Sequence, residues 1–523
     1  MKRKVLGNIL FTILFLLMLA AEALAVVAVI RLGMLPGAYL IAVIALLALF
    51  SVGIAFLLYR PARKDRKGKK LLGCVLAVIL LCGSVAIATV ANDVVKTIEA
   101  TSQETPEANT REVYVLVDSM AQTIEDTEGF TFGYVKGFDE ASAEQVIDYI
   151  HPQIPGNYAT AGYTNLFAMV NALLNEQIDA MILNGGYIDI LNETEGFVGF
   201  SEKVRILVQV PVDVVPVEEP TVNQESQPQE DTVATEATEP VETEPSQVEE
   251  TGFTKVKPFI VYVSGSDSHT EMLSSGRSDV NILAVVNPMS KQILLINTPR
   301  DYYVSNTAGG GAKDKLTHCG LYGISCSMNT LGNLYDEAVE YYVQINFTGF
   351  KKLIDAMGGI TVYSDYAFTA ITRTYISEGE NNLTGQQALD FARERYTLRG
   401  GDNERGRHQM QVIEAVIKKA TNGTTIISNY TDIMASVEGM FTMNIPAEMI
   451  GNLVKMQLSD MAQWNIITYS ATGYDAAAEC YSLPGMELSV IEPSWASVSK
   501  ATRLIDMVFS GEILTKELVD SIE

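Results

Sequence analysis

The sequence predicts an α/β protein with three transmembrane helices ahead of two globular parts. Three apolar runs lie near the N-terminus, at residues 9–30, 39–59 and 71–90, and each approaches the roughly 20 residues that a helix needs to cross a bilayer. Beyond them, apolar segments typical of buried strands alternate with segments of helical periodicity, which is the pattern of a layered α/β fold. A stretch rich in Pro, Glu and Thr divides these segments into two parts.

Basic residues decide the predicted orientation of the membrane anchor, residues 1–92. The basic residues 2–4 precede the first apolar run, and the nearly all-basic residues 60–70 follow the second. Because basic loops remain on the cytoplasmic side, both clusters predict a cytoplasmic N-terminus in the cell membrane and an extracytoplasmic chain after the third crossing. Glu22 lies within the first run, where an acid is either functional or part of a helix–helix contact.

Residues 111–211 form the first globular part, which we predict to be a small α/β accessory lobe. Its expected helices are residues 143–150 and 165–174, and its expected strands are residues 113–117, 130–135, 178–183 and 204–210. The segments YVLVDS, FTFGYV and LLNEQIDAMILNGGY resemble part of one lobe of a periplasmic solute-binding protein. Such a protein has two lobes and the chain has room here for one, so the resemblance assigns no ligand.

Residues 212–254 are a predicted disordered linker between the two globular parts. They consist mainly of Pro, Glu, Thr, Gln and Val, with no basic residue and with no aromatic residue before Phe253. Such a segment buries too little apolar surface to offset the entropy lost on ordering it. Its acids contribute to the net charge of −26, and that charge argues against a nucleic acid as a partner.

Residues 255–523 form the second globular part, a predicted α/β domain whose C-terminal extension no linker separates. Its expected helices are residues 335–343 and 349–357, and its expected strands are residues 259–265, 280–286 and 293–298. The same alternation continues at residues 433–440, 447–457, 464–468 and 497–507. Cys319 and Cys326 either pair across a turn or remain small buried thiols.

One stretch of the second part, residues 383–411, concentrates arginine in an acidic chain, at Arg393, Arg395, Arg399, Arg405 and Arg407. We expect Thr384 to cap one helix and Asp402 or Asn403 to cap the next. Four residues of the second helix then share one face: Arg405, Gln409, Val412 and Val416. Because a guanidinium group binds two phosphate oxygens at once, the stretch predicts an anion site. The alternative is a solvated surface with Glu394 and Glu404 as ion-pair partners.

Four polar clusters follow or precede predicted strands, and they contain Asp267, Arg277 with Asp279, Arg300 with Asp301, and Lys315. Loops at strand ends are where α/β folds place ligand chemistry. Two carboxylates near one edge of a sheet can share a Mg²⁺ ion, which prefers oxygen ligands and keeps phosphate as a co-ligand. A metal ion beside several arginines is an arrangement that stabilises charge during phosphoryl transfer.

The span of residues 259–420 resembles the LytR–CpsA–Psr family of cell-wall glycopolymer ligases. The matching segments are GSDSH, RSDVNILAVVNPMSKQILLINTPRDYYV, KLTHCGLYG, YYVQINFTGFKKLIDAMGGITVY, LTGQQALDFARERY and GDNERGRHQMQVI. The resemblance implies an extracytoplasmic α/β/α catalytic domain. It also implies a phosphotransferase that moves a glycopolymer, a teichoic acid or a capsular polysaccharide, from a polyprenyl-pyrophosphate carrier in the membrane lipid to peptidoglycan.

The resemblance also implies roles for single residues. It makes Asp267 and Asp279 the ligands of Mg²⁺, and it makes four arginines bind the pyrophosphate: Arg300, Arg393, Arg395 and Arg405. It adds Gln409 to that polar shell and Lys315 to its rim, and it lets Asp301 position Arg300 or a metal-bound water. Arg277 and Asp402 match the pattern as substrate-binding residues. His408 stands where the family pattern has Arg, so we expect one phosphate contact to be missing.

An apolar tunnel for the lipid tail is the last feature that the resemblance implies. The helix with Phe350, Leu353, Ile354 and Met357 either lines this tunnel or presents an ordinary core face. Two other functions compete with the ligase: a hydrolase that cleaves the lipid pyrophosphate with water, and a non-catalytic envelope sensor. The accessory lobe and the three spans favour a sensor, whereas the combined acid and arginine clusters speak against it.

Overall fold

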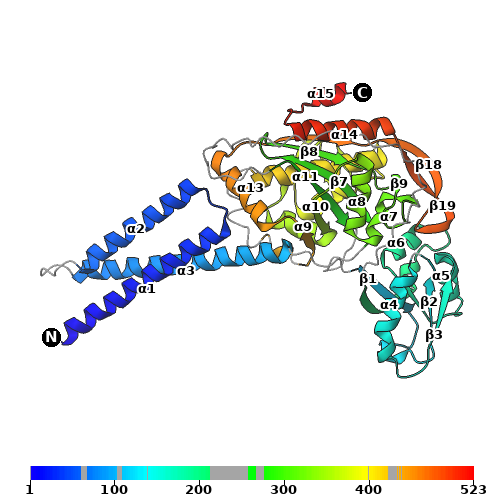
Figure 1. Cartoon of the computed structure of the whole chain (residues 1–523), viewed down its shortest axis with the longest axis horizontal. Coiled ribbons are helices and arrows are strands. Elements are labelled where there is room, and N and C mark those ends of the chain that lie inside the picture. Colours follow the sequence, from blue (N-terminus) through cyan, green and yellow to red (C-terminus); the bar gives the residue numbers. More distant parts are fainter. Residues whose placement is uncertain are drawn as a thin grey trace, which may run out of the picture.

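A computed structural model of the chain describes residues 2–59, 67–102, 109–137, 139–212, 257–266, 276–398, 400–421, 433, 435–437 and 439–522. Apart from Val212, the predicted linker at residues 212–254 lies outside the described residues. Two residues of the predicted site, Asp267 and Arg399, lie outside them as well. The long N-terminal helices extend from one side of the two globular parts (Figure 1).

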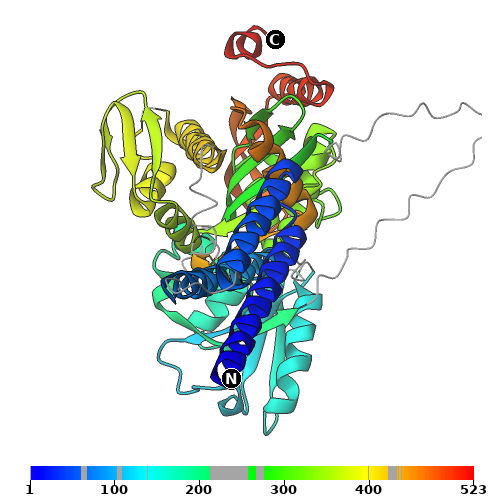
Figure 2. The same ribbon diagram turned by 90° about the vertical axis from the view of Figure 1, so that its left-hand side faces the viewer.

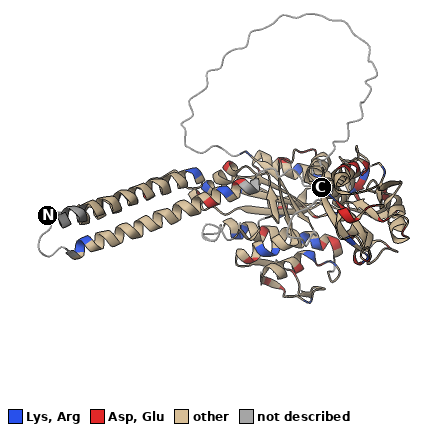
Figure 3. Cartoon of the chain, turned by 90° about the horizontal axis from the view of Figure 1, so that it is seen from below, with Lys and Arg blue, Asp and Glu red and all other residues tan. Residues whose placement is uncertain are grey.

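Three helices make up the N-terminal part: α1 (Lys2–Leu32), α2 (Gly37–Tyr59) and α3 (Lys67–Ser102). Each is long and apolar enough to cross a membrane, and Figure 3 shows few charged residues along them. Glu22 of α1 is buried, and both of its carboxylate oxygens lie 2.8 Å from the Ser51 hydroxyl of α2. Polar side chains often join helices in this way within a membrane. Glu22 is therefore part of a helix–helix contact.

The accessory lobe is a five-stranded sheet with helices on both faces, in the strand order β3-β2-β4-β1-β5. Strands β2 (Thr131–Val135), β3 (Ala159–Tyr163) and β4 (Ala180–Leu183) are parallel, whereas β1 (Asn109–Leu116) and β5 (Val204–Val212) are antiparallel to their neighbours. Alternate strand residues pack against α4 (Glu140–Ile150) on one face and against α5 (Leu166–Leu174) and α6 (Gly186–Glu193) on the other. The predicted strands and helices are present; β3 and α6, which are short, were not predicted.

A six-stranded sheet in the order β16-β11-β6-β7-β8-β17 forms the centre of the second part. Strands β6 (Phe259–Ser266), β7 (Ser278–Asn287) and β8 (Gln292–Asn297) are antiparallel neighbours. Strand β11 (Tyr341–Asn346) runs parallel to β6, and β17 (Asn465–Ser470) runs parallel to β8. The short strand β16 (Phe441–Met443) completes one edge beside β11.

Helices cover both faces of this sheet, so the predicted α/β/α layering is confirmed (Figures 1 and 2). One face packs against α7 (Leu316–Cys319), α8 (Ile324–Tyr335) and α14 (Trp495–Ser510). The other packs against α11 (Gly401–Thr421) and α13 (Ala447–Asp460). The remaining elements lie around the sheet: β9 (Tyr303–Ser305), β10 (Lys313–Lys315), the hairpin of β18 (Gly473–Cys480) and β19 (Leu483–Pro493), and α15 (Lys516–Ser521).

A smaller hydrophobic core lies beside the sheet, around Phe391. It is built from α9 (Phe347–Ala356), α10 (Gly385–Arg393) and four short strands: β12 (Ile360–Ser364), β13 (Phe368–Thr369), β14 (Tyr375–Ile376) and β15 (Gly379–Leu383). Val412 and Ala415 of α11 contribute to the same core. Helix α11 therefore joins this small core to the sheet, and α9 and α10 are held next to the strand ends.

The predicted helix at residues 335–343 is wrong. Helix α8 ends at Tyr335, and Asp336 then adopts a positive φ of 55°, which terminates the helix. The following residues form β11 because it pairs in parallel with β6 over six residues, from Tyr341 to Asn346. Cys319 and Cys326 lie on α7 and α8 as free buried thiols, so the disulfide alternative is also wrong.

Candidate active site

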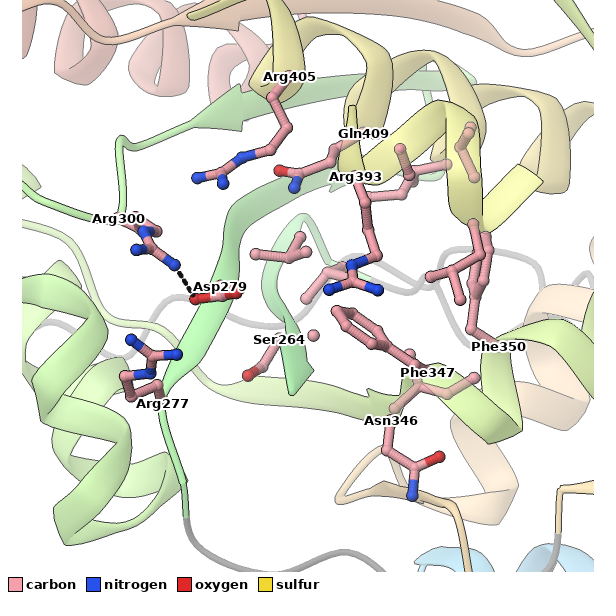
Figure 4. A pocket seen from close by; sticks show the side chains of 18 of the residues that line it. Ser264, Arg277, Asp279, Arg300, Asn346, Phe347, Phe350, Arg393, Arg405 and Gln409 are labelled. Atoms are coloured by element: carbon pink, nitrogen blue, oxygen red, sulfur yellow. Dashed lines mark hydrogen bonds and ion pairs between the residues drawn. The ribbon is translucent and has the colours of Figure 1, made fainter. Parts of the chain in front are cut away.

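A cavity of about 630 Å³ lies at the edge of the large sheet where β6 and β11 end and β7 begins. Helices α9, α10 and α11 complete its walls, and Figure 4 shows their side chains pointing into it. Its lining residues are Val263, Ser264, Gly265, Arg277, Asp279, Val280, Arg300, Ile345, Asn346, Phe347, Phe350, Leu389, Ala392, Arg393, Arg395, Tyr396, Arg405, Gln409, Val412 and Ile413. Five arginines and one aspartate thus share one cavity.

Asp279 lies at the centre of the most charged part of this cavity. Arg300 donates from Nη1 to Oδ1 of Asp279 at 2.7 Å, and the guanidinium groups of Arg277 and Arg405 lie close by (Figure 4). Burial by itself raises the pKa of Asp279, but the charges of Arg300, Arg277 and Arg405 outweigh it and lower that pKa below its ordinary value. Asp279 is therefore an ionised carboxylate among three cations.

Helix α10 and the residues directly after it supply two further arginines to the cavity. Thr384 and Gln387 form a capping box at its start, as the sequence predicted for Thr384, and Arg393 lies in its last turn. The guanidinium carbon of Arg393 lies 4.4 Å from the centre of the Phe347 ring. Arg395 donates from Nη2 to the Tyr396 hydroxyl at 2.9 Å. Aromatic rings thus contact both guanidinium groups at the cavity wall.

Helix α11 supplies Arg405 and, one turn later, Gln409. The helix begins at Gly401, so Asp402 and Asn403 lie in its first turn, and the prediction that either one caps the helix is wrong. Asp402 instead pairs with Arg405, at 2.6 Å between Oδ1 and Nη2. An acid in the first turn also suits the helix dipole. Asp402 therefore holds a lining arginine and is not itself among the lining residues.

Asp301 and Lys315 form a group of charges next to Arg300, outside the cavity lining. Oδ2 of Asp301 lies 3.6 Å from Nε of Arg300, and its Oδ1 lies 2.9 Å from Nζ of Lys315. Burial raises the pKa of Asp301, and the stronger combined effect of Lys315 and Arg300 lowers it. Neither Asp301 nor Lys315 is among the lining residues. The arrangement agrees with Asp301 as a residue that positions Arg300.

Apolar side chains form much of the cavity wall. They are those of Val263, Ile345, Phe347, Phe350, Leu389, Ala392, Val412 and Ile413. Of the four residues predicted for a lipid tunnel, all of them described, Phe350 lines the cavity, whereas Ile354 is fully buried in the small core and Met357 is also buried. The core interpretation is therefore correct for Ile354 and Met357, whereas a lipid tunnel lined by Phe350 stays a prediction.

Two basic residues of the arginine-rich stretch lie away from the cavity. Arg407 pairs with Glu404 and with Asp365, so the surface ion-pair alternative is correct for this one arginine. His408 stacks on Phe391 with a ring separation of 4.0 Å, and Nδ1 hydrogen-bonds to the Phe391 carbonyl. The His408 ring therefore faces α10, and the expected loss of one phosphate contact at this position stays a prediction.

Sequence reasoning missed Asn346, which lines the cavity and caps α9 by accepting a hydrogen bond from the Gly349 N–H at 2.8 Å. The pattern Asn-Phe-Thr-Gly at residues 346–349 is a recognisable helix start. The wrong helix at residues 335–343 hid the strand end that places Asn346 here. Ser264 was also missed because it lies within a strand rather than in the loop after it.

The second globular part matches a known family over nearly its whole length. The sequence profile of the LytR_cpsA_psr family matches residues 221–492, which is more than half of the chain. The chain belongs to the LytR–CpsA–Psr family. Every lining residue of the cavity lies inside the matched region. The anchor helices and the accessory lobe precede it.

Two relatives of the chain are both named TagU. The chain is 30% identical over 231 residues, 44% of its own length and 74% of the relative's, to the polyisoprenyl-teichoic acid–peptidoglycan teichoic acid transferase TagU of Bacillus mycoides (strain KBAB4). It is 37% identical over 183 residues, 35% of its length and 59% of the relative's, to TagU of Enterococcus faecalis (strain ATCC 700802 / V583). The crystal structure of B. subtilis TagV covers 49% of this chain and 99% of its own, at 25% identity and a TM-score of 0.41.

Proposed function

We propose that this chain is a membrane-anchored phosphotransferase that attaches a glycopolymer, a teichoic acid or a capsular polysaccharide, to peptidoglycan. The donor is the glycopolymer linked to a polyprenyl-pyrophosphate carrier. The observation that carries this proposal is the cavity itself, because five arginines and many apolar side chains line it together. A lipid diphosphate likewise combines a charged head with an apolar tail. The names of the family relatives support transfer to peptidoglycan.

The arginines account for most of the proposed mechanism. Arg277, Arg300 and Arg405 bind the diphosphate beside Asp279, and Arg393 and Arg395 bind it from the α10 side. An acceptor hydroxyl, the C6 hydroxyl of a muramic acid residue, attacks the phosphorus that carries the glycan. The bond from that phosphorus to the bridging oxygen breaks, and polyprenyl phosphate leaves with the electron pair. Fixed guanidinium groups stabilise the negative charge that this oxygen gains.

Asp279 is a poor candidate for the base that takes the acceptor's proton. A carboxylate whose pKa is lowered by Arg300, Arg277 and Arg405 against the opposing effect of burial is a weak base. Its proposed role is to hold cations: the arginines, and a Mg²⁺ ion. A carboxylate is the donor type that Mg²⁺ prefers, so Asp279 fits this ion, with Asp267 as the proposed second ligand. When bound, Mg²⁺ adds positive charge beside the diphosphate oxygens.

The proposed location follows from the anchor. Helices α1, α2 and α3 cross the cell membrane, the N-terminus is cytoplasmic, and the second part works outside the membrane. The basic residues 2–4 and 60–70 support this orientation. The apolar wall of the cavity then receives a carrier lipid from the same bilayer that holds the anchor.

The test is a transfer assay with the purified full chain, a lipid-pyrophosphate glycopolymer and peptidoglycan oligomers. Arg393→Ala is expected to lower covalent attachment about 100-fold or more, because it removes one charge-stabilising donor. Arg407→Ala, which lies in the same stretch but outside the cavity, is the matched control and is expected to keep wild-type activity. Wild-type attachment by Arg393→Ala contradicts the proposal. Release of free phosphorylated glycan without attachment identifies a hydrolase instead, and carrier binding without turnover identifies a sensor.

A further inference from the structure

The accessory lobe contacts the second part through the edge of its sheet where β4 ends. Leu321 and Leu483 of the second part belong to the same buried cluster as Leu183 and Tyr187 of the lobe. The hydroxyls of Tyr187 and Tyr322 lie 3.4 Å apart. Figure 1 shows α6 beside the second part, next to α7. This edge, where solute-binding folds place a ligand, is covered here by the chain's own second part.

The contact is closest at Gly186, the first residue of α6. A Cβ atom added there would lie 2.4 Å from Cδ2 of Leu321 and 3.3 Å from Cα of Gly276. On the far side of Leu321, a Cβ atom on Gly320 would lie 2.3 Å from the Gly276 carbonyl oxygen and 3.0 Å from the Ser278 N–H nitrogen. The start of α6, the turn at residues 320–322 and residues 276–278 therefore pack with no space for a side chain between them.

Residues 276–278, at one end of this packed contact, reach the cavity. Arg277 lines the cavity and is 5% exposed, and its charge contributes to the lowered pKa of Asp279. The hydroxyl of its neighbour Ser278 lies 2.8 Å from that of Ser264, another lining residue. A shift of residues 276–278 therefore moves a guanidinium group and a wall of the cavity together.

We propose that the accessory lobe is a positioning element of the active site. The first residues of α6 pack against Leu321, and Gly320 packs against residues 276–278. This packing holds Arg277 at the diphosphate. Gly186 and Leu321 are then positioning residues, because they act through Arg277 and touch no ligand. The inference rests on the proposed function for the identity of the ligand. It gives the lobe a role in carrier affinity, and any partner that pulls on the lobe would change that affinity.

The test compares two glycine substitutions of equal steric severity in the full chain in detergent. Gly186→Ala places a methyl group 2.4 Å from Leu321 Cδ2, across the contact. Gly133→Ala places one 2.4 Å from Ile178 Cδ1, within the lobe's own core. The first readout is the Kd for geranylgeranyl pyrophosphate, a polyprenyl pyrophosphate probe. The second is the split between KM and kcat in the transfer assay.

Gly186→Ala is expected to weaken probe binding about tenfold and to raise KM for the carrier, because a displaced guanidinium loses charge-assisted hydrogen bonds. Gly133→Ala is expected to lower the melting temperature and leave Kd unchanged. Adding Leu321→Ala to Gly186→Ala removes the clashing Cδ2 atom and should return Kd to that of Leu321→Ala alone.

Wild-type Kd in folded Gly186→Ala overturns the inference. A failure of Leu321→Ala to restore binding overturns it too, because the defect then belongs to the lobe and not to the contact. If Gly133→Ala weakens probe binding as much as Gly186→Ala does, the inference is also overturned, because the defect then lies within the lobe. A wild-type chain that binds the probe but transfers nothing contradicts the proposed function, and the binding comparison still tests the inference.

Discussion

Arg405 and Arg407 lie two residues apart on α11 and have different surroundings. The side chain of Arg405 is 11% exposed and pairs with Asp402, whereas that of Arg407 is 43% exposed and pairs with Glu404 and Asp365. Burial lowers the pKa of Arg405, against the opposing effect of Asp402 and Asp279. Two positions apart on a helix face nearly opposite directions, so one arginine enters the cavity and the other remains at the surface.

His408 provides a pH-dependent prediction at the scale of a single residue. Burial lowers the pKa of His408 from 6.5 to about 4, although the Phe391 carbonyl opposes this. The unfolded chain therefore takes up a proton on this ring before the folded chain does, and stability is lost as the pH falls from 6.5 toward 4. The loss over this window is about 3 kcal/mol, at roughly 1.4 kcal/mol per pKa unit.

The measurement is chemical unfolding of wild type and His408→Phe at pH 7 and at pH 4. A phenyl ring keeps the stacking on Phe391 and Phe368 and removes the titrating group. We expect the variant to lose about 3 kcal/mol less than wild type between the two pH values. An equal loss in both proteins would mean that other groups cause the whole acid effect.

At the scale of elements, a buried polar group joins β10 and α7 to the hairpin of β18 and β19. Asp314 is fully buried; its carboxylate lies 2.7 Å from Nδ1 of His318 and accepts hydrogen bonds from the N–H and the hydroxyl of Ser482. Asp314, His318 and Cys480 lie within 4.8 Å of one another, a spacing that a metal ion also uses. Burial raises the pKa of the Cys480 thiol to about 12, and the hydrogen bonds of Asp314 with Ser482 connect the hairpin to β10.

Asp314→Ala is expected to destabilise the second part by about 3 kcal/mol, because it leaves several buried donors without an acceptor. Thermal unfolding of the variant measures this loss. Asp475→Asn on the exposed side of β18 is the control and should change stability little. A wild-type melting temperature in Asp314→Ala would show that the hairpin is held by apolar contacts instead.

At the scale of the whole molecule, α3 connects the membrane anchor to the second part without a break. The helix contacts β16 and α13, and its buried residues Ala91, Val94 and Ile98 recur on one face. Strand β16 pairs with β11, which ends at the cavity. In the proposed membrane arrangement, a continuous helix of this kind would set the height of the cavity above the bilayer.

Val94→Asp is expected to separate α3 from the second part, because burial of a charge without a partner is unfavourable. Transfer from a carrier embedded in vesicles should then fall about tenfold or more, since the cavity loses its orientation to the bilayer. Binding of a detergent-soluble polyprenyl pyrophosphate should stay unchanged. Asn92→Asp, at an exposed position of the same helix, is the control. Equal loss in both assays would indicate damage to the cavity and not to its placement.

The sequence by itself determined the features that depend on local pattern. The apolar runs predicted the three anchor helices, and Thr384 predicted the start of α10. The family motifs indicated which charged side chains belong to the site. These follow from the sequence because a helix period, a cap or a motif involves neighbouring residues.

The tertiary structure alone decided which of these side chains meet. It brought Arg277 and Arg300 to Arg405, more than 100 residues away along the chain, and left Arg407 and His408 outside the cavity. It also paired residues 341–346 with β6 as a strand, in agreement with the strand preference of their Tyr, Val and Ile residues. The physical reason is that the cavity is formed by strand pairing and helix packing between distant segments, and no local window of sequence contains those contacts.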